Sequence, residues 1–136
     1  MKKSLLLLAG VFLSSFLSAQ VLFEEHFSGT TFPPAGWMVF GNMQNWTTSQ
    51  TNNASGTAPE MRVKGTPSFT GNQRIIGPQI NTTGYTSVII RLKHMFDHAD
   101  GNSSPITLGV DTRSNNGAWN SVWSTNATAD IAAQTL

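Results

Sequence analysis

The densest group of metal-ligating side chains lies at residues 97–102, which read Asp-His-Ala-Asp-Gly-Asn. Asp97, Asp100 and Asn102 offer oxygen ligands, and Gly101 permits a sharp turn between them. Calcium binds several such hard oxygens at short range, so this spacing predicts a calcium loop, although not an EF-hand. The alternative is a plain turn, because Asp, Asn and Gly are also common turn-forming residues.

A zinc site at His94 and His98 is not expected from their spacing. On a strand these side chains share a face but lie about 13 Å apart, at about 3.3 Å per residue. Zinc–nitrogen bonds are only about 2 Å long. One zinc ion therefore cannot bind both side chains if this segment is extended.

Groups that support catalysis do not come together in the sequence. Glu24 and Glu25 are adjacent, so on a strand they point to opposite faces. They cannot act as paired glycosidase carboxylates, which lie about 5–10 Å apart across a cleft. The chain has no cysteine and no G-x-S-x-G, H-E-x-x-H or phosphate-loop motif. We predict a chain without catalytic residues, and a glycan-active enzyme on a sandwich fold is the least favoured alternative.

The four tryptophans are the remaining candidates for ligand contact. Exposed tryptophan side chains stack on sugar rings and anchor protein contacts. Trp119 and Trp123 share parity on an expected strand, which would give one strand face an aromatic character. We predict that both bind ligand, and the alternative is that both pack in the core. Trp37 follows a Pro-Pro turn and is expected in the core.

Short β-prone segments, separated by clusters of Gly, Asn, Ser, Thr and Pro, must position these residues. No segment carries apolar residues at helical spacing, so the pattern predicts an all-β sandwich of antiparallel strands. The sequence Ser-Asn-Asn-Gly at 114–117 predicts a hairpin turn. The expected strands are 21–27, 37–40, 45–49, 60–64, 73–80, 87–96, 106–113 and 118–124.

Residues 1–19 have the features of a secretory signal peptide. Lys2 and Lys3 precede an apolar run at 4–16, and Ala19 stands at the expected cleavage point. The run is shorter than the about 20 apolar residues that a membrane span requires. Cleavage after Ala19 would release residues 20–136 as one secreted or cell-surface domain that is not inserted in the membrane.

The composition of residues 20–136 argues against two classes of partner. These residues hold six Lys and Arg against seven Asp and Glu, a net charge of −1. Nucleic acids and anionic membrane surfaces both require clustered cations, so neither partner is expected. Because the chain has no cysteine, its stability must come from sheet packing, supplemented by a structural metal ion if one binds.

The last residues suggest that the domain continues. After a polar stretch that begins at Ser124, residues 131–136 could begin another strand. A sandwich that ended there would leave an unpaired edge. We therefore expect residues 20–136 to form an incomplete sandwich within a longer product.

Five motifs occur in a particular order along residues 21–125. They are Phe-Glu-Glu-His-Phe at 23–27, Phe-Pro-Pro-Ala-Gly-Trp at 32–37, Trp46, Ile-Gly-Pro-Gln-Ile at 76–80, and the hairpin from Val110 to Trp119. In this order they resemble the cleaved-adhesin (gingipain adhesin-type) domains, which are related to the MAM-like "choice-of-anchor" jelly rolls of secreted Bacteroidetes proteins. The resemblance implies a jelly-roll sandwich that serves as a non-catalytic module, often beside a peptidase.

The resemblance also implies ligands. Members of the family are associated with host proteins, haem or carbohydrate, and several carry structural calcium. Glu25 matches the family's first-strand acidic residue, which tends to join a calcium site, and the alternative is a solvated edge-strand carboxylate. The family's Asp-rich loop is replaced here by uncharged residues at 41–45. We expect an adhesion module for a host or matrix protein or a glycan, or else an accessory structural domain of a larger secreted peptidase or other hydrolase.

Overall fold

A computed structural model describes residues 20–98 and 104–136 of the chain. The predicted signal peptide at 1–19 therefore lies outside the described residues. Within them the chain is all-β, as predicted, and its one helical element is the 3₁₀ turn η1 (Met43–Asn45). No helix in this part is long and apolar enough to span a membrane.

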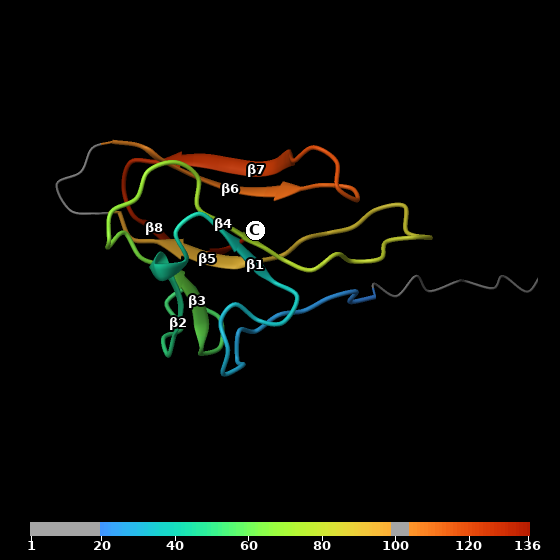
Figure 1. Cartoon of the computed structure of the whole chain (residues 1–136), viewed down its shortest axis with the longest axis horizontal. Helices are drawn as coiled ribbons and strands as arrows, with labels where there is room; N and C mark the ends of the chain where they lie inside the picture. Colours follow the sequence, from blue (N-terminus) through green and yellow to red (C-terminus); the bar gives the residue numbers. More distant parts are fainter. Residues whose placement is uncertain (1–19, 99–103) are drawn as a thin grey trace, which may run out of the picture.

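The eight described strands form four antiparallel pairs, an arrangement consistent with a β-sandwich (Figure 1). The pairs are β1 (Met38–Phe40) with β4 (Arg74–Ile76), β2 (Trp46–Ser49) with β3 (Glu60–Val63), β5 (Lys93–Phe96) with β8 (Ile131–Thr135), and β6 (Ile106–Thr112) with β7 (Asn120–Ala127). In the view of Figure 1, β6 and β7 lie at the upper side, β2 and β3 lie at the lower side, and β5 and β8 lie between them.

The hairpin of β6 and β7 is the most extensive ladder, with seven paired positions. Its turn is the predicted one, because the Gly117 N–H donates to the Ser114 carbonyl at 3.0 Å. The register jumps between Val110, which faces Trp123, and Asp111, which faces Ser121. Val122 is therefore an extra residue, and a bulge of this kind changes the faces to which the flanking side chains point.

Residues 21–27 were predicted as a strand, and that prediction is wrong. The Glu25 carboxylate accepts the Phe27 N–H at 2.5 Å, and Phe27 has a positive φ of 55°. This local turn takes the place of a ladder. The rings of Phe23 and Phe27 instead pack on Trp37, with centroids 6.0 and 5.3 Å from it.

The predicted strand at 87–96 is only partly present, because pairing covers β5 alone. The β5–β8 ladder reaches back to Leu92, whose carbonyl accepts the Leu136 N–H at 2.9 Å. The preceding residues have no ladder partner in the described part of the chain. Val88, Ile89 and Ile90 are consequently 51, 75 and 48% exposed.

The apolar core is small. Among the described residues Ala127 is the one buried apolar side chain, at 5% exposed, whereas fifteen large apolar side chains are exposed. The local order of the loops therefore depends strongly on specific polar contacts.

Candidate binding surface

The predicted calcium loop at 97–102 is described only at its edge. Asp97 is exposed, while Asp100 and Asn102 lie outside the described residues. The neighbouring His98 is buried, its backbone N–H donates to the Asp130 carboxylate at 2.8 Å, and its Nε2 lies 3.2 Å from the Ser104 carbonyl. These contacts anchor the chain on both sides of the loop.

Glu25, the other predicted calcium ligand, is half-buried and accepts the Phe27 N–H. Across residues 20–98 and 104–136 no group of three or more His, Cys, Asp and Glu side chains comes close enough together to hold a metal ion. Glu25 and Asp97 therefore do not belong to one such described group. Calcium binding at either position stays a prediction.

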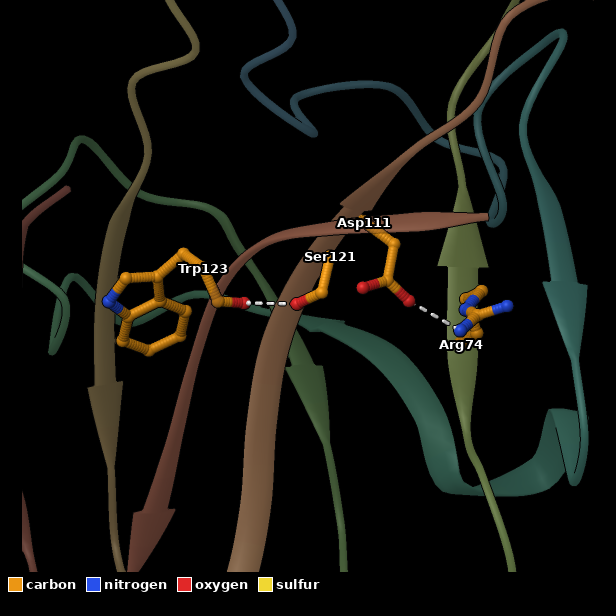
Figure 2. Close-up of polar contacts among 4 residues, drawn as sticks. All are labelled: Arg74, Asp111, Ser121 and Trp123. Carbon is orange, nitrogen blue, oxygen red and sulfur yellow. Dashed lines mark hydrogen bonds and ion pairs between the residues drawn. The ribbon is translucent and has the colours of Figure 1, made fainter. Parts of the chain in front are cut away.

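The two predicted ligand-binding tryptophans have different neighbours. Trp123 is half-buried and meets the His94 ring edge-on at 5.3 Å, and its backbone carbonyl accepts the Ser121 hydroxyl at 3.4 Å (Figure 2). Trp119 lies just before β7, on the other side of the Val122 bulge, and contacts two arginines. The bulge explains why equal sequence parity does not give the two rings common surroundings.

Trp119 belongs to a guanidinium–tryptophan cluster that comprises Arg74, Asp111, Arg113 and Trp119. The guanidinium carbons of Arg74 and Arg113 lie 4.7 and 4.4 Å from the indole centroid. Arg74 also donates to the Asp111 carboxylate at 2.6 Å, which Figure 2 shows as a bridge from β4 to β6. Because no ladder joins these strands, the cluster links two strand pairs.

The charges of the cluster are not balanced. Asp111 neutralises Arg74 within a half-buried ion pair, in which the two side chains are 30 and 25% exposed. Arg113 is exposed and forms no ion pair with any described carboxylate. One net positive charge therefore remains beside the aromatic ring. Sequence patterns missed this cluster, because Arg74 and Asp111 are 37 positions apart.

A shallow groove of about 330 Å³ begins at the turn of the same hairpin. We call it the Asn115 groove. The Gln79 side-chain amide donates to Asn115 Oδ1 at 3.3 Å, and the Thr83 N–H donates to Asn81 Oδ1 at 3.0 Å. The groove is lined by Gln79, Ile80, Asn81, Thr82, Thr83 and Asn115.

A second shallow groove of about 490 Å³ lies beyond the ends of β1 and β4. We call it the Phe69 groove after its aromatic side chain, which is 39% exposed. It contains amide, hydroxyl and aromatic side chains but no ionisable one. The groove is lined by Gly41, Asn42, Ser68, Phe69, Thr70 and Gln73.

One wall of the Phe69 groove is fixed by a close approach between backbone and side chain. Gln73 Oε1 accepts the Asn42 N–H at 2.6 Å. A Cβ atom on Gly41 would lie 2.5 Å from the same oxygen, and Gly41 has a φ of 103°. Only glycine fits this position without moving Gln73.

The other wall of the Phe69 groove depends on Asn45, which is completely buried. Its side-chain amide donates to the carbonyls of Lys64 and Pro67, each at 2.7 Å, and its backbone carbonyl accepts the Lys64 N–H at 2.8 Å. These bonds fix the segment that leads directly into Ser68 and Phe69. Asn45 therefore positions a wall that it does not itself line.

The loop between β2 and β3 is held by the Glu60 carboxylate. Burial alone would raise the pKa of Glu60. The Thr51 hydroxyl, the Ala54 and Asn53 N–H groups and the charge of Arg62 outweigh burial and hold the pKa below its ordinary value of 4.5. The donors lie 2.6 to 3.1 Å from the carboxylate oxygens. This arrangement caps a loop and satisfies its donors, as structural carboxylates commonly do.

Comparison of the chain with protein-family models, with curated proteins and with solved structures finds no match.

Proposed function

We propose that the chain is an exported, non-catalytic binding module that recognises carbohydrate or protein at the cell surface. The observation that carries this proposal is the chemistry of the Phe69 groove. Uncharged amide and hydroxyl side chains line it together with one exposed aromatic ring. Sugars offer hydroxyl groups for such amides and apolar C–H faces for such rings. Carbohydrate is therefore the ligand class that this groove favours.

The rigidity of both walls supports the same conclusion. Asn45 fixes the segment before Ser68, and the Asn42 N–H holds the Gln73 side chain. A groove whose polar groups are already oriented loses less conformational entropy when a ligand binds. This matters for a shallow groove, because few contacts are available to offset that entropy.

The family resemblance supplies the rest of the proposal. It implies a jelly-roll sandwich of the cleaved-adhesin type, secretion after removal of residues 1–19, and structural calcium near Glu25 or the 97–102 loop. Calcium should raise the Tm of the wild-type chain, and it should raise the Tm of an Asp97→Asn variant by less. A Glu25→Gln variant tests the other position, and the calcium part fails if calcium leaves the wild-type Tm unchanged or raises the Tm of wild type, Asp97→Asn and Glu25→Gln equally.

The binding function is tested on arrays of glycans and extracellular matrix proteins with wild-type chain and Phe69→Ala. Tyr85→Ala is the matched control, because Tyr85 is also aromatic and comparably exposed, at 43% against 39% for Phe69. We expect a signal that Phe69→Ala abolishes and Tyr85→Ala retains. Absence of any signal, or equal loss in both variants, contradicts the proposal.

A second candidate function is an accessory domain that packs against a neighbouring polypeptide of a larger secreted hydrolase. The observation in its favour is the unpaired segment with exposed Val88, Ile89 and Ile90. An unpaired segment with exposed apolar side chains can pair with the edge strand of another polypeptide. Hydrogen exchange tests this in the full-length gene product. Strong protection of the amides at 87–92 would favour the accessory role, and rapid exchange there would argue against it.

A further inference from the structure

We propose that Arg113 and the Asn115 groove together form a second site, which binds an anionic saccharide carrying a carboxylate or a sulfate ester. The inference rests on the proposed binding function and adds a ligand class at a separate place on the surface. The Phe69 groove has no ionisable lining residue. The two sites therefore require different ligands and can be tested independently.

Trp119 restrains the side chain of Arg113. Its guanidinium lies over the Trp119 indole at 4.4 Å. This contact restricts the motion of the guanidinium, and because Arg113 is exposed, its N–H edge remains accessible to a ligand. That edge matches the two oxygens of a carboxylate or sulfate. An arginine restrained in this way loses less entropy on binding an anion than a free surface arginine does.

The described carboxylates leave the charge of Arg113 unmatched. Arg74 lies over the same ring at 4.7 Å, but its charge is matched by Asp111 at 2.6 Å. Arg113 has no such carboxylate among the described residues. The cluster thus keeps one unneutralised guanidinium, to which a ligand anion can supply the missing charge.

The Asn115 groove begins two residues after Arg113 in the chain. Asn115 lies on the groove wall with the hydroxyl and amide side chains of Thr82, Thr83 and Gln79. The volume of about 330 Å³ is at the low end of small-ligand sites, which suits one sugar unit. Ile80 is the one apolar lining residue, so the groove offers little to an apolar peptide side chain.

The test is isothermal titration of the full chain with trigalacturonate, with its neutral methyl ester, with a sulfated galactose trisaccharide, and with an acidic peptide. We expect binding of at least one anionic probe and much weaker binding of the ester. Arg113→Gln should weaken anionic binding by about tenfold or more, since a charge-assisted bond is lost. Arg113→Lys should restore only part of it, because lysine lacks the planar fork. Whichever anionic probe binds identifies the group as carboxylate or sulfate.

Arg91→Gln is the matched control, because Arg91 is also exposed but has no aromatic contact among the described residues. A second variant, Asn115→Gly, removes the amide and tolerates the positive φ of 51° at this position, and it should also weaken binding. Circular dichroism checks that each variant is folded.

Three results would overturn the inference. They are equal binding of trigalacturonate and its methyl ester, equal losses in Arg113→Gln and Arg91→Gln, and tighter binding of an acidic peptide than of either anionic sugar. If the anionic probes do not bind but the array signal still depends on Phe69, the inference fails and the proposed function stands. If neither anionic-probe binding nor a Phe69-dependent array signal is seen, the inference and the proposed function both fail.

Discussion

Replacing Asn45 with alanine should destabilise the chain and disturb the Phe69 groove together. The side chain is 0% exposed, and its amide donates two bonds of 2.7 Å to the carbonyls of Lys64 and Pro67. A net contribution of about 1 to 1.5 kcal/mol for each bond gives a loss of about 2 to 3 kcal/mol in the free energy of unfolding. Alanine offers no donor to these two carbonyl groups, which would lose their hydrogen bonds.

The assay is urea unfolding followed by tryptophan fluorescence, since Trp46 is the next residue. Asn45→Asp keeps the size of the side chain but removes both donors and places a carboxylate beside two carbonyls. It should destabilise the fold by more than alanine does, because burial of an unpaired charge is unfavourable. Asn53→Ala is the control, because Asn53 is exposed and its bond to Glu60 uses only the backbone N–H.

The control should change the free energy of unfolding by less than about 0.5 kcal/mol. The reasoning is refuted if Asn45→Ala also changes the free energy of unfolding by less than about 0.5 kcal/mol. It is also refuted if Asn45→Ala unfolds earlier but binds ligand at the Phe69 groove with unchanged affinity under folding conditions. Asn45 would then stabilise the chain without positioning the groove.

Three further predictions concern the contacts that hold the loops. A double-mutant cycle with Arg74→Gln and Asp111→Asn should give a coupling of about 1 kcal/mol in the free energy of unfolding, because the ion pair is half-buried. Additive effects of the two substitutions would contradict a stabilising Arg74–Asp111 ion pair. Because the folded pKa of Glu60 lies below 4.5, its stabilising contribution is present above that pH and is lost as the pH falls through the folded value. Glu60→Gln should therefore make the free energy of unfolding depend less on pH below about pH 4.5. The same pH dependence in the variant and the wild type would contradict a stabilising role of the Glu60 carboxylate in this loop. Gly41→Ala should lower the free energy of unfolding by about 1 to 3 kcal/mol, through backbone strain and the displacement of Gln73, and a neutral effect in urea unfolding would contradict the fixed wall.

Features that depend on near neighbours in sequence were predicted well. The turn at 114–117 and its two strands follow from alternation and turn chemistry, both of which are local. The segments 21–27 and 87–91 have equally good strand composition, yet they lack ladders among the described residues. A strand needs a partner, and composition does not say whether a partner is present.

The candidate site was predicted less well for a similar reason. Trp119 was singled out, but its partner Arg74 comes from a different strand pair, and the Val122 bulge separates Trp119 from the surroundings of Trp123. The Phe69 groove was not foreseen, because its walls come from segments on either side of the β2–β3 pair. One available signal was Gly41, a glycine directly after an apolar strand pattern.

The most direct test of a neutral carbohydrate site is an NMR titration of the isotope-labelled chain with the neutral oligosaccharide that gives the strongest array signal. We predict that the amide shifts of Asn42, Ser68, Thr70 and Gln73 change in a saturable way, while the sugar itself remains intact. Shift changes that leave these four amides untouched, or the appearance of cleaved sugar, would contradict a non-catalytic binding groove at this place.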